Sequence, residues 1–301
     1  MNCFGANLAY QKPRMKRVHQ IRKPAQPHWV GDGFPVRNFL SYQEPEPFRP
    51  FLLLDYAAPH TFAPSTKARG VGPHPHHGFE TVTIAYQGEV AHRDSAGHGG
   101  TIGPGDVQWM TAAAGVVHEE MHGERFTREG GTFEMVQLWV NLPARAKMQK
   151  PRYQDLKSAA IPVVALPGNA GQARVIAGTL LSATGPAHTV TPVGLWDVTL
   201  RAERPTTLPL TAGHTALLLV QRGAIVVAGA DAVASNELAI LQRDGSTLEL
   251  CARGGDAQVL VMTGEPIDEP VVGHGPFVMN SWPEIRQAVD DFQSGRMGNL
   301  D

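Results

Sequence analysis

Glycine and proline punctuate this chain at short intervals, and between them lie runs of β-branched and aromatic residues. One such run is "TVTIAY" at residues 81–86, which ends at the turn "QGE", and another is "VQWM" at 107–110, which follows the turn "GPGD". Turn signals that recur about every 8–12 residues are typical of antiparallel sandwiches and barrels. The 32 glycines and 24 prolines are spread along the chain, so we predict an all-β protein of many short strands.

The β-rich pattern occurs twice, which predicts two tandem barrels of one architecture. The chain has 301 residues, which suits two domains of about 150 residues each. A charged, proline-bounded stretch separates the two blocks, and a few short helices are expected outside the strands. We predict these boundaries: a basic N-terminal arm at 1–24, an N-terminal barrel at 25–145, a linker at 146–172, and a C-terminal barrel at 173–301.

The C-terminal region ends in a predicted helix. Ser281 followed by Glu284 fits a capping box, with Pro283 in the first turn. Apolar residues then follow at helical spacing: Ile285, Ala288, Val289 and Phe292. We expect this amphipathic helix to lie against a barrel.

Composition and charge exclude several classes of protein. The net charge of −2 provides no global field that would hold nucleic acid, and no window reaches the ~18 consecutive apolar residues of a membrane span. The N-terminus has no apolar core of a secretory signal, and its basic residues from Lys12 to Lys23 indicate a solvated arm. Two cysteines, Cys3 and Cys251, form no disulfide framework, so we expect a reducing, cytoplasmic compartment.

Histidines concentrate in the first block, where seven of the thirteen lie between residues 74 and 122. Side chains alternate between the two faces of a strand, so His74 and His76 of "HPHH" share one face and His77 points away. The same alternation in "HEEMH" (118–122) brings two histidines and Glu120 to one face. These three residues are His118, Glu120 and His122.

Two such groups on separate strands can converge around one divalent ion inside a small barrel. Three neutral imidazoles and one carboxylate leave one or two positions open for water, O2 or substrate, as in the sites of non-haem iron oxygenases. His92 and Asp94 form another pair on one face, which we interpret as a structural ion pair near the loop at 96–100. The second block has only His188 and His214 within its strands, so we expect no metal there.

Three long segments resemble one known family. They are "HPHHGFETV" with "GEVAHRDSAGHGGTIGPGDVQWMTAAAGVVHEEM" (74–121), "VQLWVNLPARAKMQKPRYQDL" (136–156) and "GEPIDEPVVGHGPFVMNSWPEI" (264–285). Together they resemble the pirin family of the bicupin superfamily, over residues from about 25 to about 298. The resemblance implies two cupin barrels with a single mononuclear metal, usually iron, in the N-terminal one.

The resemblance also implies a ligand set, which is His74, His76, His118 and Glu120. His122 lies one strand step beyond and is expected to be a pocket or surface residue. Glu80 has the spacing of the carboxylate in the wider cupin pattern, H-x-H-x3-E, but in pirin-like sequences the carboxylate follows the third histidine. We therefore assign Glu80 as a second-shell or strand-end group. At His77 many family members carry arginine, so any salt bridge made by that arginine is in doubt here.

Some pirin-like proteins have quercetin 2,3-dioxygenase activity, and the resemblance implies O2-dependent ring cleavage of a flavonol at this site. A metal beside the substrate can lower the pKa of the flavonol hydroxyl as a Lewis acid, and Glu120 could also accept the substrate proton. The implied metal is Fe(II), with Ni, Mn, Cu, Zn or Co as alternatives. The implied partners are the flavonol and O2, in a monomeric protein.

Two alternatives remain open at this point. Pirins in some organisms are iron-dependent regulatory partners of other proteins, acting as transcriptional or metabolic co-regulators without required turnover. The same four ligands would serve that role, in which the metal is a structural or redox switch and the partner is a protein. The other alternative is a dioxygenase that acts on a different enol or catechol.

Overall fold

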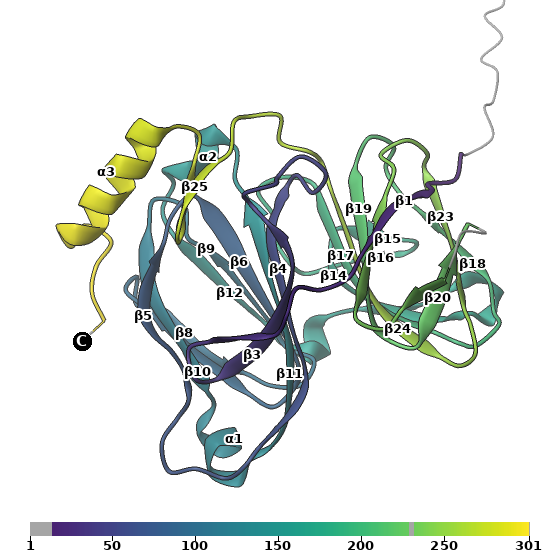
Figure 1. The fold of residues 1–301 in the computed structure, drawn as a ribbon, viewed down its shortest axis with the longest axis horizontal. Helices are drawn as coiled ribbons and strands as arrows, with labels where there is room; N and C mark the ends of the chain where they lie inside the picture. Colours follow the sequence, from purple (N-terminus) through teal and green to yellow (C-terminus); the bar gives the residue numbers. More distant parts are fainter. Residues whose placement is uncertain (1–13, 229–231, 301) are drawn as a thin grey trace, which may run out of the picture.

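Two β-barrels lie side by side in the computed structural model, which describes residues 14–228 and 232–300 (Figure 1). The predicted all-β architecture of two tandem barrels with a C-terminal helix is confirmed. Each barrel is a seven-stranded sheet packed on a four-stranded sheet, with antiparallel pairing throughout. No helix among the described residues is long and apolar enough to cross a membrane.

The first barrel is formed mainly by residues 28–156. Its seven-stranded sheet has the order β12 (Arg152–Leu156), β9 (Val107–Thr111), β6 (Phe79–Gln87), β11 (Gly131–Asn141), β4 (Phe51–Phe62), β3 (Phe34–Ser41) and β2 (His28–Val30). Its four-stranded sheet has the order β5 (Gly70–His76), β10 (Val116–His122), β7 (Val90–Asp94) and β8 (Gly99–Ile102).

The second barrel repeats this arrangement. Its seven-stranded sheet has the order β1 (Val18–Arg22), β22 (Glu237–Leu241), β19 (Thr215–Arg222), β24 (Ala257–Gly264), β17 (Val193–Leu200), β14 (Gly171–Ala177) and β13 (Val163–Ala165). Its four-stranded sheet has the order β18 (Thr206–Pro209), β23 (Thr247–Ala252), β20 (Ala224–Val227) and β21 (Ala232–Ala234).

The remaining elements are short, apart from one helix. They are the hairpins β15 (Thr179–Leu180) with β16 (Ala183–Thr184) and β25 (Val272–His274) with β26 (Phe277–Met279), and the helices α1 (Glu124–Glu129), α2 (Ala144–Lys147) and α3 (Trp282–Gln293). The N-cap of α3 is Ser281, whose hydroxyl accepts from the backbone N–H of Glu284, with Pro283 in the first turn. The predicted start of this helix is therefore confirmed.

The two seven-stranded sheets face each other and share one apolar core. Side chains alternate along each strand, so Val82 and Ile84 of β6 point toward the second barrel, while Leu217 and Leu219 of β19 point back. All four are fully buried in one continuous cluster that spans both barrels. The other face of each sheet lines the interior of its own barrel.

The expected solvated arm does not hold for the residues of that segment that the structure describes, and the predicted linker contains two strands. Strand β1, which lies within the predicted arm, pairs with β22 of the second barrel, and Lys16 before it is buried. The Lys16 ammonium donates to the carbonyls of His214 and Arg243. Lys12 and Cys3 lie outside the described residues.

In the predicted linker, β12 extends the first barrel by pairing with β9, and β13 extends the second by pairing with β14. Edge pairing satisfies backbone groups that a free linker would leave to water. The predicted linker at 146–172 therefore contains both edge strands, and the chain passes from one barrel to the other between them, at residues 157–162.

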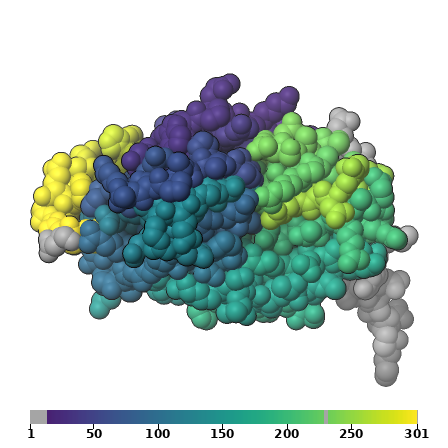
Figure 2. Space-filling model, turned by 90° about the horizontal axis from the view of Figure 1, so that it is seen from below, coloured from purple at the N-terminus to yellow at the C-terminus, as the bar shows by residue number. Residues whose placement is uncertain are grey.

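The C-terminal segment, predicted as part of the second domain, packs on the first barrel. Phe277, Met279 and Ile285 bury their side chains against Val117 of β10. Figures 1 and 2 show this segment, in yellow, at the end of the first barrel that lies away from the second. The helix does lie against a barrel, but the sequence pattern did not say which one.

Lys147 of α2 holds the C-terminal segment to the first barrel. Its side chain is 1% exposed, and its ammonium donates to the carbonyls of Gly78 and Val278 at 2.6 and 2.9 Å and to Asn141 Oδ1 at 2.7 Å. All three ammonium donors are therefore satisfied inside the protein.

Lys147→Met should destabilise the protein by about 2–4 kcal/mol, because it leaves buried oxygen acceptors without a donor. Urea unfolding measures this change. Lys150→Met is the matched control, since Lys150 is exposed and its loss should change the free energy of unfolding by less than about 0.5 kcal/mol. Equal effects of the two substitutions would contradict the role of Lys147.

Candidate metal centre

Strands β5 and β10 bring three imidazoles together inside the first barrel. His74 lies directly opposite His118 in the antiparallel pair, and His76 follows two residues along the same face of β5. One ring nitrogen from each of the three lies within 4.8 Å of the others. His76 and His118 are buried and His74 is partly exposed, so the group lies where the barrel interior meets a cavity. The predicted convergence of these three histidines is what the structure shows.

The orientation of His118 follows from a chain of hydrogen bonds behind it. Its Nδ1 lies 3.2 Å from His92 Nδ1, and His92 Nε2 lies 3.3 Å from Asp94 Oδ2. Asp94 only accepts, so His92 carries its proton on Nε2 and accepts on Nδ1 from His118. The lone pair of His118 is then on Nε2, which is buried and has no hydrogen-bond partner among the described residues.

Asp94 is held as a carboxylate. Burial alone would raise its pKa, but hydrogen bonds from His92 and from the backbone N–H of His98 lower it below the usual range. The contact between His92 and Asp94 that the sequence indicated near the 96–100 loop is present, as a hydrogen bond from a neutral imidazole and not as an ion pair, and it lies directly behind a predicted ligand. The H-x-D spacing does not predict this position, because it contains no information on the strand order that places β7 beside β10.

The other two imidazoles are also held in position. His74 Nδ1 lies 2.8 Å from the carbonyl of Gly72, so it donates there and keeps its lone pair on Nε2. His76 packs edge-to-face against Phe79 and Trp139, and its Nδ1 is buried without a hydrogen-bond partner in the part of the chain that the structure describes. Burial lowers the pKa of His76 and of His118 well below 6.5, so both rings are neutral at pH 7, as metal ligands must be. These residues fit a divalent metal.

Glu120 lies in the same cavity but outside this group of three nitrogens. It follows His118 on the same face of β10, while β5 contains an irregularity opposite, so that Glu120 faces Val71. Its Oε1 lies 3.1 Å from the hydroxyl of Thr83 and 3.4 Å from Gln108 Nε2. The role of Glu120 as a fourth ligand therefore stays a prediction.

The cavity in front of the histidines has a volume of about 410 Å³. Its polar groups besides the ligand candidates are His28, Asp55 and Gln137, which lie on β2, β4 and β11. The rest of the wall is mostly apolar: Val30, Phe34, Val36, Leu53, Val71, Met135 and Trp139. This size and this lining are typical of a site for a small, largely apolar molecule.

His77 and His122 are both outside the ligand group. His77 points away from it, as predicted, but it is buried beneath the C-terminal segment rather than exposed, and its backbone N–H donates to Pro276. His122, expected in a pocket or on the surface, is instead buried in a cluster of phenylalanines, where it contacts the carbonyl of Gly33 at 2.9 Å. The second histidine of "HEEMH" is thus a satisfied core residue.

Glu80 points to the opposite face of β6 from the metal cavity. It shares that face with Val82 and Ile84, which pack toward the second barrel, whereas Thr83 faces Glu120. Its carboxyl accepts from the hydroxyl of Thr111 at 2.6 Å, and burial raises its pKa to about 7 although this hydrogen bond opposes the shift. Of the two roles considered, the structure supports a strand-end group.

Comparisons with known proteins agree with this geometry. A family model described as Pirin matches residues 33–140, and one described as the Pirin C-terminal cupin domain matches 195–298. A Pseudomonas aeruginosa protein named "Putative quercetin 2,3-dioxygenase" is 56% identical, over 94% of this chain and 98% of its own. A "Pirin-like protein" from Caulobacter vibrioides is 40% identical, over 90% and 95%.

A solved structure gives the same architecture. The crystal structure of quercetin 2,3-dioxygenase from Acinetobacter baumannii superposes with a TM-score of 0.92 at 50% identity, covering 95% of this chain and all of that one.

His92→Ala should weaken metal binding about 10- to 100-fold, because it removes the acceptor that orients His118. Competition with a chromophoric chelator measures the affinity. His98→Ala is the matched control: His98 contacts the same Asp94 at 3.2 Å, but it is partly exposed and does not contact His118. Wild-type affinity in His92→Ala would show that His118 needs no partner.

Glu80→Gln should stabilise the protein at pH 8 and change little at pH 5. The folded-state pKa of Glu80 is about 7, above its ordinary value of 4.5, so the stability from its neutral form is lost as pH rises from 4.5 through 7. Glutamine does not ionise, so the gain at pH 8 should be about 3 kcal/mol. Urea unfolding at both pH values tests this, and an equal effect at pH 5 and 8 would contradict it. The exposed Glu129→Gln is the control.

Proposed function

Because this chain belongs to the pirin family, we propose that it is a metal-dependent dioxygenase that opens the ring of a flavonol such as quercetin with O2. The observation that supports this most directly is the group of three imidazoles, two of which, His74 and His76, line a largely apolar cavity. The names of its bacterial relatives point to the same activity. The proposed metal ligands are His74, His76, His118 and Glu120.

The proposed metal is Fe(II), since imidazole nitrogens with one carboxylate are the ligands of many non-haem iron oxygenases. Nickel, manganese, copper, zinc and cobalt accept the same ligands, and availability in the cell selects among them. When bound, the metal would supply a positive charge that lowers the pKa of a flavonol hydroxyl.

The cavity walls suit a flat aromatic substrate. Phe34, Met135 and Trp139 offer apolar and ring surfaces, while Gln137 and His28 can hydrogen bond to substrate hydroxyls. None of the described residues that line the cavity is Lys or Arg. An ionised flavonol oxygen would therefore find no counter-charge in the lining itself, so a metal held by the three histidines would have to supply it.

The proposed acceptor of the substrate proton is Glu120. It is 6% exposed, it lines the cavity, and its carboxylate is the acidic group on the same strand face as His118. The hydroxyl of Thr83 lies 3.1 Å from Glu120 Oε1 and 2.7 Å from Gln137 Oε1, and it can donate its single proton to either oxygen. A buried carboxylate with few hydrogen bonds is a competent general base.

Incubation of the metal-loaded protein with quercetin, with and without air, tests the proposal. We expect O2 uptake and release of carbon monoxide in air, and neither without it. His118→Ala should lose both metal and turnover. A protein that keeps its metal and binds quercetin but takes up no O2 would contradict the dioxygenase proposal and favour the regulatory alternative.

Glu120→Gln separates the two roles of this carboxylate. If Glu120 is the base, the variant should retain metal and lose turnover by about 100-fold or more. If Glu120 is mainly a ligand, metal content itself should fall. Full turnover with full metal content in Glu120→Gln would contradict both roles. The matched control is Glu119→Gln, because Glu119 lies on the opposite face of the same strand.

A further inference from the structure

Five polar side chains form one row across the seven-stranded sheet of the first barrel. Their strands, β9, β6, β11, β4 and β3, are neighbours in the sheet, and each residue lies directly opposite the next in the strand register. In this order, the five residues are Gln108, Thr83, Gln137, Asp55 and Asn38. Directly opposite residues share a sheet face, and Gln137 and Asp55 line the cavity in front of the histidines. The row therefore lies on the interior face of the sheet.

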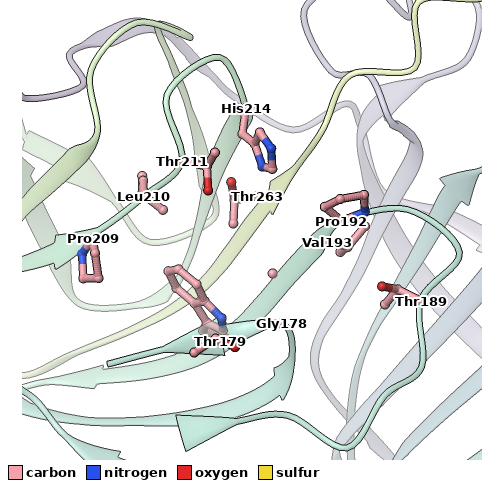
Figure 3. Close-up of a pocket in the computed structure, with 12 residues that line it drawn as sticks. Gly178, Thr179, Thr189, Pro192, Val193, Pro209, Leu210, Thr211, His214 and Thr263 are labelled. Carbon is pink, nitrogen blue, oxygen red and sulfur yellow. The ribbon is translucent and has the colours of Figure 1, made fainter. Parts of the chain in front are cut away.

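The fold does not require this row to be polar. The second barrel has the same strand arrangement, and a row of directly opposite residues across its corresponding strands is buried in one apolar cluster. That row is Val175, Trp196, Val261, Leu218 and Ala239. A cavity at the mouth of the second barrel, shown in Figure 3, has no Asp or Glu among the described residues that line it. The polar row is therefore a property of the first barrel, and packing alone does not explain it.

Two neighbours in the row, Asp55 and Gln137, each keep one polar atom free for a ligand. Asn38 donates to Asp55 Oδ1 at 2.8 Å, whereas Asp55 Oδ2 has no hydrogen-bond partner among the described residues. Gln137 contacts Thr83 through Oε1 at 2.7 Å, and its Nε2 has no partner in the described part of the chain. Neither free atom is enclosed, since the two residues are 7% and 9% exposed and both line the cavity. A ligand in the cavity can therefore reach both.

The carboxylate of Asp55 has no strong counter-charge. Among the described residues, no Lys or Arg lines the cavity, and none shifts the pKa of Asp55. Burial raises this pKa, although the hydrogen bond from Asn38 and the nearby His28 oppose the shift. A carboxylate in such a place is stabilised by each further hydrogen-bond donor that reaches it. A neutral ligand hydroxyl is such a donor, while a negatively charged group would be repelled.

The placement of the two free groups indicates the class of ligand. Directly opposite residues on neighbouring strands have Cβ atoms about 4.5–5.5 Å apart, so Asp55 and Gln137 present a carboxylate and an amide side by side. Two hydroxyls on adjacent carbons of an aromatic ring match this pair. One hydroxyl can donate to the carboxylate, and the other can bond to either end of the amide, because a hydroxyl both donates and accepts.

This pair lies one strand repeat away from the histidine group. Trp139 of β11 packs against His76, with ring centroids 5.2 Å apart, and Gln137 lies two residues from Trp139 on the same strand face. Two residues span about 7 Å along a strand. A molecule of two linked ring systems can therefore place one end at the histidines and a hydroxylated ring beside Asp55.

We propose that Asp55 and Gln137 form a recognition site for a catechol ring, so that this protein selects flavonols with two adjacent hydroxyls on the ring away from the metal. Asp55 accepts a hydrogen bond from one of these hydroxyls, and Gln137 bonds to the other. The inference rests on the proposed function, because the other end of the ligand is the flavonol part that the metal would hold. Quercetin carries such a catechol ring, and galangin is the same flavonol without hydroxyls on that ring.

Calorimetric titration of the metal-loaded protein without air measures the affinity for each flavonol apart from turnover. We expect quercetin to bind about tenfold more tightly than galangin, since it makes the additional hydrogen bonds. Asp55→Asn should weaken the binding of quercetin about tenfold, because it removes a charged acceptor, and should change that of galangin by less than about twofold. Gln137→Leu should weaken the binding of quercetin about fivefold by removing the neutral partner.

A matched control separates recognition from a general effect of the substitution. Asp197 is also 7% exposed, and it lies on the seven-stranded sheet of the second barrel, outside the cavity. Asp197→Asn should therefore bind both flavonols as the wild type does. Thermal unfolding checks that the variants are folded. Asp55→Asn should be at least as stable as the wild type, because asparagine keeps an acceptor for Asn38 and carries no buried charge.

Three results would overturn the inference. One is equal affinity of the wild type for quercetin and galangin. Another is a preference for quercetin that persists in Asp55→Asn, which would place the catechol elsewhere, such as at the metal. The third is an equal loss of both flavonols in Asp55→Asn. Failure of the dioxygenase proposal is a different outcome: O2 uptake would be absent, while the preference for quercetin and its loss in Asp55→Asn would remain and support the recognition site.

Discussion

The packing of two seven-stranded sheets against each other is the contact on which the rest of this structure depends. Each strand exposes alternate residues to two faces, and one face of each sheet is used for the contact. That face must be apolar, as Val82, Ile84, Leu217 and Leu219 are. The other face does not take part in this contact, so in the first barrel it can carry Thr83, Gln108 and Gln137, opposite the histidines and Glu120 of the four-stranded sheet.

The first barrel uses this freedom for a polar interior that would be costly without partners. His118 and His76 are buried in their neutral forms, and the carboxylate of Asp94 fixes His118 through His92. Each hydrogen bond behind the rings leaves a nitrogen directed toward the shared space. A network satisfied on one side and open on the other is what a metal requires, because the ion supplies the missing partner.

The chain ends connect the two barrels. Strand β1 joins the sheet of the second barrel, while the C-terminal hairpin and helix cover the first barrel beside His77. Lys147 is central to the second of these contacts, since it bonds to Gly78 and Val278 at once. The segment that follows the second barrel therefore helps to shape the cavity of the first, to which Pro276 contributes.

The sequence by itself determined the fold class and the two barrels, because the spacing of turns is a local property of the chain. It also determined that His74 and His76 share a strand face, because side chains alternate along a strand, and it made His118 their candidate partner. It did not reveal the positions of β1, α3 or His92, since pairing between distant strands depends on register and packing. Local spacing made His122 and Glu80 candidates as well. Only the tertiary structure shows that His122 lies in an aromatic core and that Glu80 lies on the sheet face directed toward the second barrel. The physical reason is that the packing of the sheets decides which face of a strand lines a cavity.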